Sequence, residues 1–260
     1  MVSIKVSCQE LLRFGEILKK EGYNQIFMCG SDISFGGRDK FYKQHGDYEI
    51  FDYISAKNNG RYTGGLEGWG FLDKNLYGFA KEEITRLSKE EKPFNCTILT
   101  VDTHHMEGLP CNLCPKEYDQ QYANVIACAS KQLDNFIEWI KQQDFYQNTT
   151  IVFVGDHATM SNVWEEYYPE DYDRTMVNCF INSAVSPKGK LNSRDFYAMD
   201  MFPTILASLG AQIEGDRLGI GTNLFSNKLT LAEELGDKYF TKEVSKRSEF
   251  YDQTILEIGK

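Results

Sequence analysis

The sequence has no apolar run approaching the roughly 18 residues that a membrane span requires, and no charged segment followed by an apolar one opens it. It also lacks a basic stripe: 38 acidic residues against 28 basic ones give a formal net charge of −10. The charge balance therefore argues against a nucleic-acid partner, because no basic stripe is present to replace the counterions of a phosphate backbone. We expect these 260 residues to behave as a soluble piece.

Disorder is excluded by composition, since 42% hydrophobic and 13% aromatic residues are globular values. Short apolar runs predict strands, and apolar residues at helical spacing predict helices between them. The expected strands are 25–28, 96–101, 150–154 and 176–181, and the expected helices are 9–22, 82–91, 116–143 and 199–209. This alternation predicts a three-layer α/β/α fold with a mainly parallel sheet. We expect one domain over residues 1–226 and a peripheral helical segment over 227–260.

The apolar run 150–154 ends in Gly155, and the next two residues are Asp156 and His157. Open α/β sheets keep their ligands at the carboxyl ends of strands, where these two side chains are expected. A hard carboxylate oxygen beside an imidazole suits Mn²⁺, Mg²⁺ or Zn²⁺. We therefore interpret Asp156 and His157 as candidate metal ligands, against the alternative of a turn with a capping aspartate.

Histidine is scarce, with four in the chain, and two more of them follow another predicted strand. The run 95–101 leads into His104 and His105, and the run 25–28 leads into a glycine-flanked segment that contains Arg38. Three predicted strands are thus followed by histidine, aspartate or arginine side chains. Because the carboxyl ends of parallel strands lie at one edge of a sheet, this pattern predicts a single polar site. The alternative for Arg38 is a surface ion pair with a neighbouring aspartate.

Seven cysteines do not settle the redox compartment. Cys111 and Cys114 lie in a proline-flanked loop and can be read as a disulfide or as two ordinary thiols. A zinc knuckle requires a second ligand pair at similar spacing, and the sequence contains none.

Several ordered blocks of the sequence resemble the phosphoglycerol transferases, a family that includes the enzymes modifying osmoregulated glucans and the lipoteichoic acid synthases. The blocks are Gly15–Tyr23 and Ile26–Gly46, Thr100–His105, Val154–His157, Met199–Gly210 and Arg217–Gly221. The resemblance covers roughly residues 9–226, and the glucan-modifying branch is the nearer one.

The resemblance implies a sulfatase and alkaline-phosphatase-like fold on the outer face of the cytoplasmic membrane. It implies transfer of phosphoglycerol from phosphatidylglycerol to a glycan or polyglycerol-phosphate acceptor, with a threonine nucleophile and a divalent metal, most often Mn²⁺. By motif match, Asp156 and His157 are expected to bind the metal, His104 to be catalytic, and Arg38 and His105 to contact substrate.

The same resemblance places the nucleophilic threonine and the first metal-binding carboxylate upstream of the block near Leu11. We therefore expect this chain to lack both, together with the membrane segment of the family. Two alternatives stay open: a sulfatase or phosphoethanolamine transferase of the same superfamily, and a fragment without activity of its own.

Overall fold

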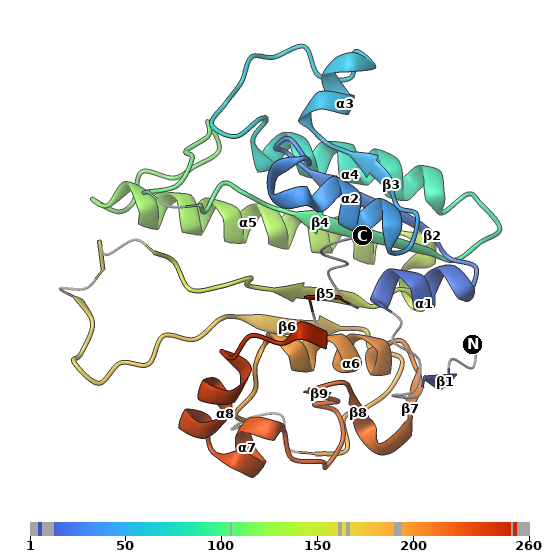
Figure 1. Cartoon of the computed structure of the whole chain (residues 1–260). Coiled ribbons are helices and arrows are strands. Elements are labelled where there is room, and N and C mark those ends of the chain that lie inside the picture. Colours follow the sequence, from blue (N-terminus) through green and yellow to red (C-terminus); the bar gives the residue numbers. More distant parts are fainter. Residues whose placement is uncertain are drawn as a thin grey trace. The chain divides into compact units, whose positions relative to one another are not determined.

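The computed structural model describes residues 5–6, 13–104, 106–160, 163–164, 167–189, 194–250 and 252–253. The chain divides into two compact units (Figure 1), a larger one of residues 12–182 and a smaller one that combines residues 1–11 with 183–260. No helix among the described residues is both long enough and apolar enough to cross a bilayer.

The larger unit is built around a parallel sheet in the order β3-β2-β4. Its strands are β2 (Asn24–Cys29), β3 (Glu49–Phe51) and β4 (Phe94–Leu99). The helices of this unit are α1 (Phe14–Lys20), α2 (Arg38–Gln44), α3 (Tyr53–Asn58), α4 (Asp73–Leu87) and α5 (Gln121–Lys141), with short 3₁₀ turns η1 (Phe35–Gly37) and η2 (Asp144–Asn148). A separate antiparallel pair joins β5 (Ile151–Val154) to β6 (Asn178–Ile181).

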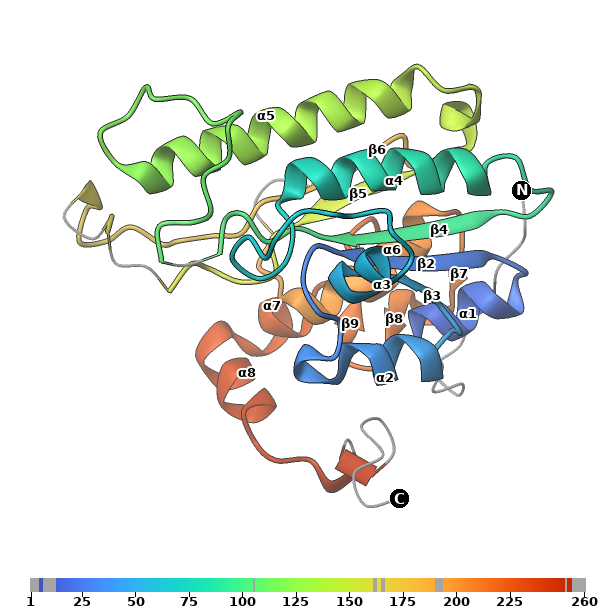
Figure 2. The ribbon, with the colours of Figure 1, turned by 90° about the horizontal axis from the view of Figure 1, so that it is seen from above.

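Both faces of the parallel sheet are covered, because successive side chains of β2 point to opposite sides. Ile26 and Met28 belong to one apolar cluster with residues of α4 and α5, whereas Phe27 and Cys29 belong to another, against which Tyr42 of α2 packs. Figure 2 shows α4 and α5 on one side of β2 and β4, and α1 and α2 on the other. This arrangement confirms the predicted α/β class with helices on both faces of a parallel sheet.

The smaller unit contains β1 (Lys5–Val6) paired in parallel with β7 (Gln212–Ile213), and an antiparallel pair of β8 (Arg217–Leu218) with β9 (Gly221–Thr222). Its helices are α6 (Ala198–Ser208), α7 (Leu231–Leu235) and α8 (Asp237–Val244), and a 3₁₀ turn η4 spans Glu214–Asp216.

Buried Asp200 organises the smaller unit. Its carboxylate accepts a hydrogen bond from the Tyr197 backbone N–H at 2.9 Å, which caps the start of α6. It also accepts one from the Thr222 N–H at 2.6 Å, which ties β9 to the same helix. The block Met199–Gly210 therefore carries a structural carboxylate.

Candidate functional site

The carboxyl edge of the parallel sheet brings two of the predicted site residues together. Cys29 at the end of β2 pairs with Leu99 at the end of β4, and both strands run in the same direction. The segments that follow the two strands leave the sheet from one edge. The first carries Arg38 at the start of α2, and the second carries His104.

Two aromatic rings connect Arg38 with His104 at this edge. The Trp69 ring centroid lies 5.0 Å from that of His104 and 6.3 Å from that of Phe35. The guanidinium carbon of Arg38 lies 5.5 Å from the centroid of the Phe35 ring. Phe35 and Trp69 keep 69% and 47% of their surface exposed, so these rings are accessible. We call these four residues, Phe35, Arg38, Trp69 and His104, the edge cluster.

Arg38 is fixed by its own loop. Its Nε donates to the carbonyl oxygen of Phe35 at 3.0 Å, and one terminal nitrogen, Nη2, donates to Ser31 Oγ at 3.2 Å and to the Asp32 carbonyl at 2.9 Å. Within the described part of the chain, the other terminal nitrogen has no hydrogen-bond partner and no carboxylate forms an ion pair with the guanidinium. Arg38 is thus a preoriented cation with one nitrogen available to an anion.

The loop that carries Trp69 is held against the end of β2 by backbone contacts. The Phe71 N–H donates to the carbonyl oxygen of Gly30 at 2.9 Å, and Ser31 and Gly70 form an isolated antiparallel bridge. A Cβ atom at Gly70 would overlap the Gly30 carbonyl oxygen, so only glycine permits this approach. The position of the Trp69 ring therefore depends on two glycines at the strand end.

Two buried carboxylates hold the segment that leads to His104. Asp73 accepts hydrogen bonds from the N–H groups of Val101 and Asp102 at 2.9 Å each, and Asp102 accepts one from the Asp73 N–H at 3.0 Å. Burial raises the pKa of Asp73 to about 6, and burial together with the nearby Asp73 charge raises the pKa of Asp102 to about 7. The reciprocal bonds fasten the end of β4 to the start of α4.

Asp156 and His157 follow β5, as predicted, and both side chains are largely exposed. The Asp156 carboxylate accepts a hydrogen bond from the His157 N–H at 2.9 Å and lies 3.4 Å from its Nε2. The imidazole Nδ1 lies 2.9 Å from the Ala158 carbonyl oxygen. The two side chains thus pair with each other.

Tyr122 of α5 joins the His104 segment to the segment after His157. Its buried hydroxyl lies 2.9 Å from the Thr103 carbonyl oxygen and 3.0 Å from Thr159 Oγ1. A phenol can donate to one of these atoms and accept from the other, so one hydroxyl can satisfy both contacts. The two strand ends that carry the predicted histidines are therefore connected through α5.

The donor types of Asp156 and His157 suit a divalent cation, but two donors do not complete a site. Among the described residues, no third histidine, cysteine or carboxylate joins them within ligand distance of a common centre. His105 lies outside the described residues. Among the described residues, Asp156 and His157 thus offer two of the donors that a divalent cation would need.

Sequence reasoning missed two contributors to this region. Phe35 lies in the glycine-flanked segment that contains Arg38, and Tyr122 lies in the predicted helix 116–143, where an aromatic residue by itself indicates only a packed face. A tyrosine on a buried helical face does carry a signal, because its hydroxyl requires a partner when it is buried.

Comparison with known proteins supplies the family. Residues 7–211 match the sulfatase family. Over 222 residues the chain is 30% identical to phosphoglycerol transferase I from Shigella flexneri and to that from Escherichia coli, which covers 82% of this chain and 28% of each relative. The chain thus spans less than a third of the length of these curated relatives.

Solved structures agree on the fold. A protein in the alkaline phosphatase superfamily from Vibrio parahaemolyticus matches with a TM-score of 0.59 at 22% identity, over 76% of this chain and 47% of that one. The lipoteichoic acid synthase LtaP from Listeria monocytogenes matches with a TM-score of 0.57 at 20% identity, over 80% of this chain and 54% of that one. With the family match over most of its length, the chain belongs to the sulfatase family.

Proposed function

We propose that this chain takes part in the transfer of phosphoglycerol from a phosphatidylglycerol-type lipid to a glycan or polyglycerol-phosphate acceptor. The observation that carries the proposal is the edge cluster, in which a preoriented arginine lies beside one exposed ring and a histidine beside the next. The proposal is also supported by the 30% identity of the chain, over 222 residues, to phosphoglycerol transferase I.

Arg38 is suited to binding the phosphoryl group. Phosphoryl transfer gathers negative charge on the non-bridging oxygens, and a guanidinium with a fixed orientation stabilises that charge without reorganising. The Nη1 nitrogen, which has no hydrogen-bond partner among the described residues, is the group that would contact a phosphate oxygen.

His104 is suited to moving a proton at the same phosphate. An imidazole can donate a proton to a leaving oxygen or accept one from an attacking hydroxyl. Its ring lies against Trp69, and the exposed faces of Trp69 and Phe35 offer apolar surface to the glycerol moiety or to the lipid. His105 keeps the substrate-contacting role that its motif predicts.

Proteins of this superfamily generally use divalent metal ions. We propose that Asp156 and His157 are two of the ligands of such an ion, with Mn²⁺ favoured by the motif resemblance. The metal would supply positive charge near the phosphoryl oxygens. Further ligands and a threonine nucleophile would complete the site, which the motif resemblance places on the outer face of the membrane.

The test is binding of sn-glycerol 1-phosphate to the purified 260-residue chain, measured by calorimetry. Arg38→Ala is expected to weaken binding roughly 10-fold or more, because a charge-assisted hydrogen bond is lost. Lys40→Ala is the matched control: it removes an equal charge from an exposed position of α2 and should leave binding nearly unchanged. Equal affinities of wild type and Arg38→Ala would refute the assignment.

Sulfate-ester hydrolysis is the second candidate, and the sulfatase family match favours it. The same calorimetric experiment with inorganic sulfate in place of glycerol phosphate separates the two. Tighter binding of sulfate than of glycerol phosphate, lost in Arg38→Ala, would replace the first proposal by this one.

A further inference from the structure

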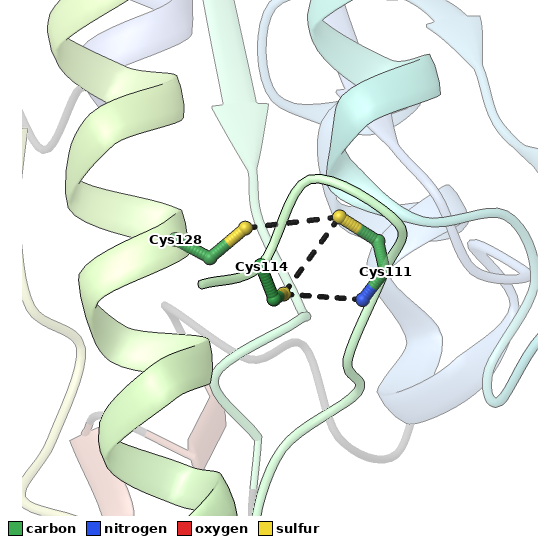
Figure 3. Close-up of side chains that lie close together, drawn as sticks. All are labelled: Cys111, Cys114 and Cys128. Carbon is green, nitrogen blue, oxygen red and sulfur yellow. Dashed lines mark hydrogen bonds between the residues drawn. The ribbon is translucent and has the colours of Figure 1, made fainter. Parts of the chain in front are cut away.

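The strongest cluster of metal-binding side chains lies outside the edge cluster. Cys111 and Cys114 of the loop after β4 meet Cys128 of α5, with their sulfur atoms turned toward one another (Figure 3). The sulfurs of Cys111 and Cys128 are 3.7 Å apart, and those of Cys111 and Cys114 are 3.8 Å apart. All three ligand atoms lie within 4.8 Å of one another.

These separations match a tetrahedral metal centre. Zinc–sulfur bonds of about 2.3 Å at tetrahedral angles place neighbouring sulfurs about 3.8 Å apart. A disulfide, in contrast, requires an S–S distance of about 2.05 Å. In the sequence only Cys111 and Cys114 stand at zinc-ligand spacing, whereas the fold adds a third sulfur from Cys128 of α5, 14 residues after Cys114.

Three N–H groups are directed at the sulfurs. The Cys111 N–H donates to Cys114 Sγ at 3.2 Å and the Leu113 N–H donates to Cys111 Sγ at 3.3 Å. The amide nitrogen of Gln132 donates to Cys128 Sγ at 3.4 Å. Such donors stabilise negative charge on sulfur, as they do around ligating thiolates in metal sites.

Gln132 also offers a fourth ligand. Its side chain is buried, and within the described part of the chain its Oε1 has no hydrogen-bond partner. Rotating the amide by 180° exchanges oxygen and nitrogen. The amide then gives up its hydrogen bond to sulfur, and its oxygen lies 3.4 Å from Cys128 Sγ and 4.0 Å from Cys111 Sγ. In a tetrahedral zinc site with one oxygen ligand, the oxygen lies about 3.6 Å from each sulfur ligand.

We propose that Cys111, Cys114 and Cys128 bind a thiophilic cation, Zn²⁺ in first place, with Gln132 at the fourth position. Soft thiolates select zinc over Mg²⁺, Ca²⁺ or Mn²⁺, so this site is chemically distinct from the Asp156–His157 pair. Zinc binding displaces the thiol protons and involves no oxidation or reduction.

The consequence is structural. The cysteine loop follows directly on the His104 segment, where the Leu109 N–H donates to the Asp102 carbonyl oxygen at 2.7 Å. The residues described between β4 and α5 form no helix or strand. A metal at the three sulfurs would fasten this loop to α5, the helix that also carries Tyr122. The inference does not rest on the proposed phosphoglycerol transfer.

The test is Co²⁺ titration of the reduced chain under anaerobic conditions, followed by displacement with Zn²⁺. Cobalt bound by thiolates gives a sulfur-to-metal charge-transfer absorption, which binding at Asp156 and His157 cannot produce. We expect one equivalent of cobalt with this absorption. Uptake without the absorption, or no uptake, would overturn the proposal.

The variants are Cys111→Ser, Cys114→Ser and Cys128→Ser, each expected to weaken Zn²⁺ binding by roughly 100-fold or more. Cys179→Ser is the matched control, because Cys179 lies on β6 outside the cluster. Cys114 is only half-buried, so its variant should retain the wild-type circular dichroism even if Cys128→Ser does not fold. Unchanged zinc affinity in a folded Cys114→Ser variant would refute the site.

A disulfide is the competing state of these sulfurs. The reduced chain is exposed to air with one equivalent of Zn²⁺, and its cysteines are then mapped by mass spectrometry. Free Cys111, Cys114 and Cys128 together with retained zinc are expected. Formation of a bond between any two of them, with release of zinc, would show that the cluster is a disulfide site.

Discussion

At the scale of single residues, Tyr122 is the side chain that connects the two histidine-bearing segments. Tyr122→Phe removes only the hydroxyl, so the contacts with Thr103 and Thr159 are lost while the ring still packs. We expect the free energy of unfolding to fall by about 0.5–1.5 kcal/mol. Urea denaturation measures it, with Tyr118→Phe as the control because Tyr118 is exposed. Equal effects of the two changes would contradict the bridging role.

Asp102 gives a prediction about pH. Burial, and then the Asp73 charge, raise its pKa from 3.8 to about 7 in the folded chain. The folded state therefore holds the proton more tightly than the unfolded state, and stability contributed by this group declines as pH rises from about 4 to about 7. At about 1.4 kcal/mol per pKa unit, the full loss is on the order of a few kcal/mol.

Asp102→Asn keeps an oxygen to accept the Asp73 N–H but cannot ionise. We expect the variant to be more stable than the wild type at pH 8 and to lose much of the decline between pH 5 and pH 8. Thermal unfolding across this range measures the difference, and Asp119→Asn, at an exposed carboxylate, is the control. A variant that follows the wild-type pH profile would contradict the raised pKa.

The positions of the candidate site residues were predictable where each follows a strand. His104, Arg38, Asp156 and His157 follow predicted strands, and the structure puts His104 and Arg38 at one sheet edge. Cys128 was not predictable as a partner of Cys111, because the 17-residue separation depends on how a loop folds back onto a helix. Sequence motifs for metal ligands detect pairs that are a few residues apart, such as Cys111 and Cys114. They cannot detect the pair of Cys111 and Cys128.

At the scale of elements, a buried carboxylate of α4 binds one arginine outside the helix and one within it. Glu83 is 6% exposed and pairs with Arg61 and, at 2.8 Å, with Arg86. Although burial acts to raise its pKa, the hydrogen bonds to Arg61 and Arg86 lower the pKa of Glu83 below the usual 4.5. Its contribution to stability is therefore present above pH 4.5 and is lost as the pH falls through the lowered value.

We expect Glu83→Gln to reduce the free energy of unfolding at pH 7 by about 1–3 kcal/mol, because two guanidinium groups lose their shared anion. Glu82→Gln is the matched control: Glu82 also pairs with Arg61 but is 63% exposed, so a change below about 0.5 kcal/mol is expected. Urea denaturation of both variants measures these losses in the free energy of unfolding. Similar losses for Glu83→Gln and Glu82→Gln would contradict the special role of the buried carboxylate.

Most elements were predictable because their apolar periodicity is strong. The strands at 25–28 and 150–154 and the helix at 199–209 appear within one or two residues of their expected bounds. Strand β3 was missed, because the three residues Glu49–Phe51 are too short to show a period. The antiparallel direction of β6 relative to β5 was also missed, since local sequence does not encode which way a strand runs.

At the scale of the whole molecule, the fold class was predictable from the alternation of strands and helices, and the family from ordered motifs. The division into two units was not, because residues 1–11 join residues 183–260, which are distant in sequence. The chain matches less than a third of the length of its relatives, so the activity of those whole transferases is a proposal for these 260 residues.

The larger unit holds two chemically different candidate metal sites, one of thiolates and one of a carboxylate with an imidazole. The thiolate site has three sulfurs in place, whereas Asp156 and His157 are the two hard donors that the described residues provide. Mn²⁺ prefers oxygen and nitrogen ligands, and a site with two protein ligands binds weakly. We expect the chain to bind Mn²⁺ with a dissociation constant of about 0.1 mM or weaker.

Calorimetry of Mn²⁺ binding to the wild type, Asp156→Ala and Cys114→Ser measures this directly. Asp156→Ala should abolish the weak signal, and Cys114→Ser should leave it unchanged because thiolates do not favour manganese. Micromolar binding that disappears in Asp156→Ala would contradict the expectation of weak binding, because further ligands would then have to converge on this strand end. Mn²⁺ binding that survives Asp156→Ala would remove Asp156 from the candidate site.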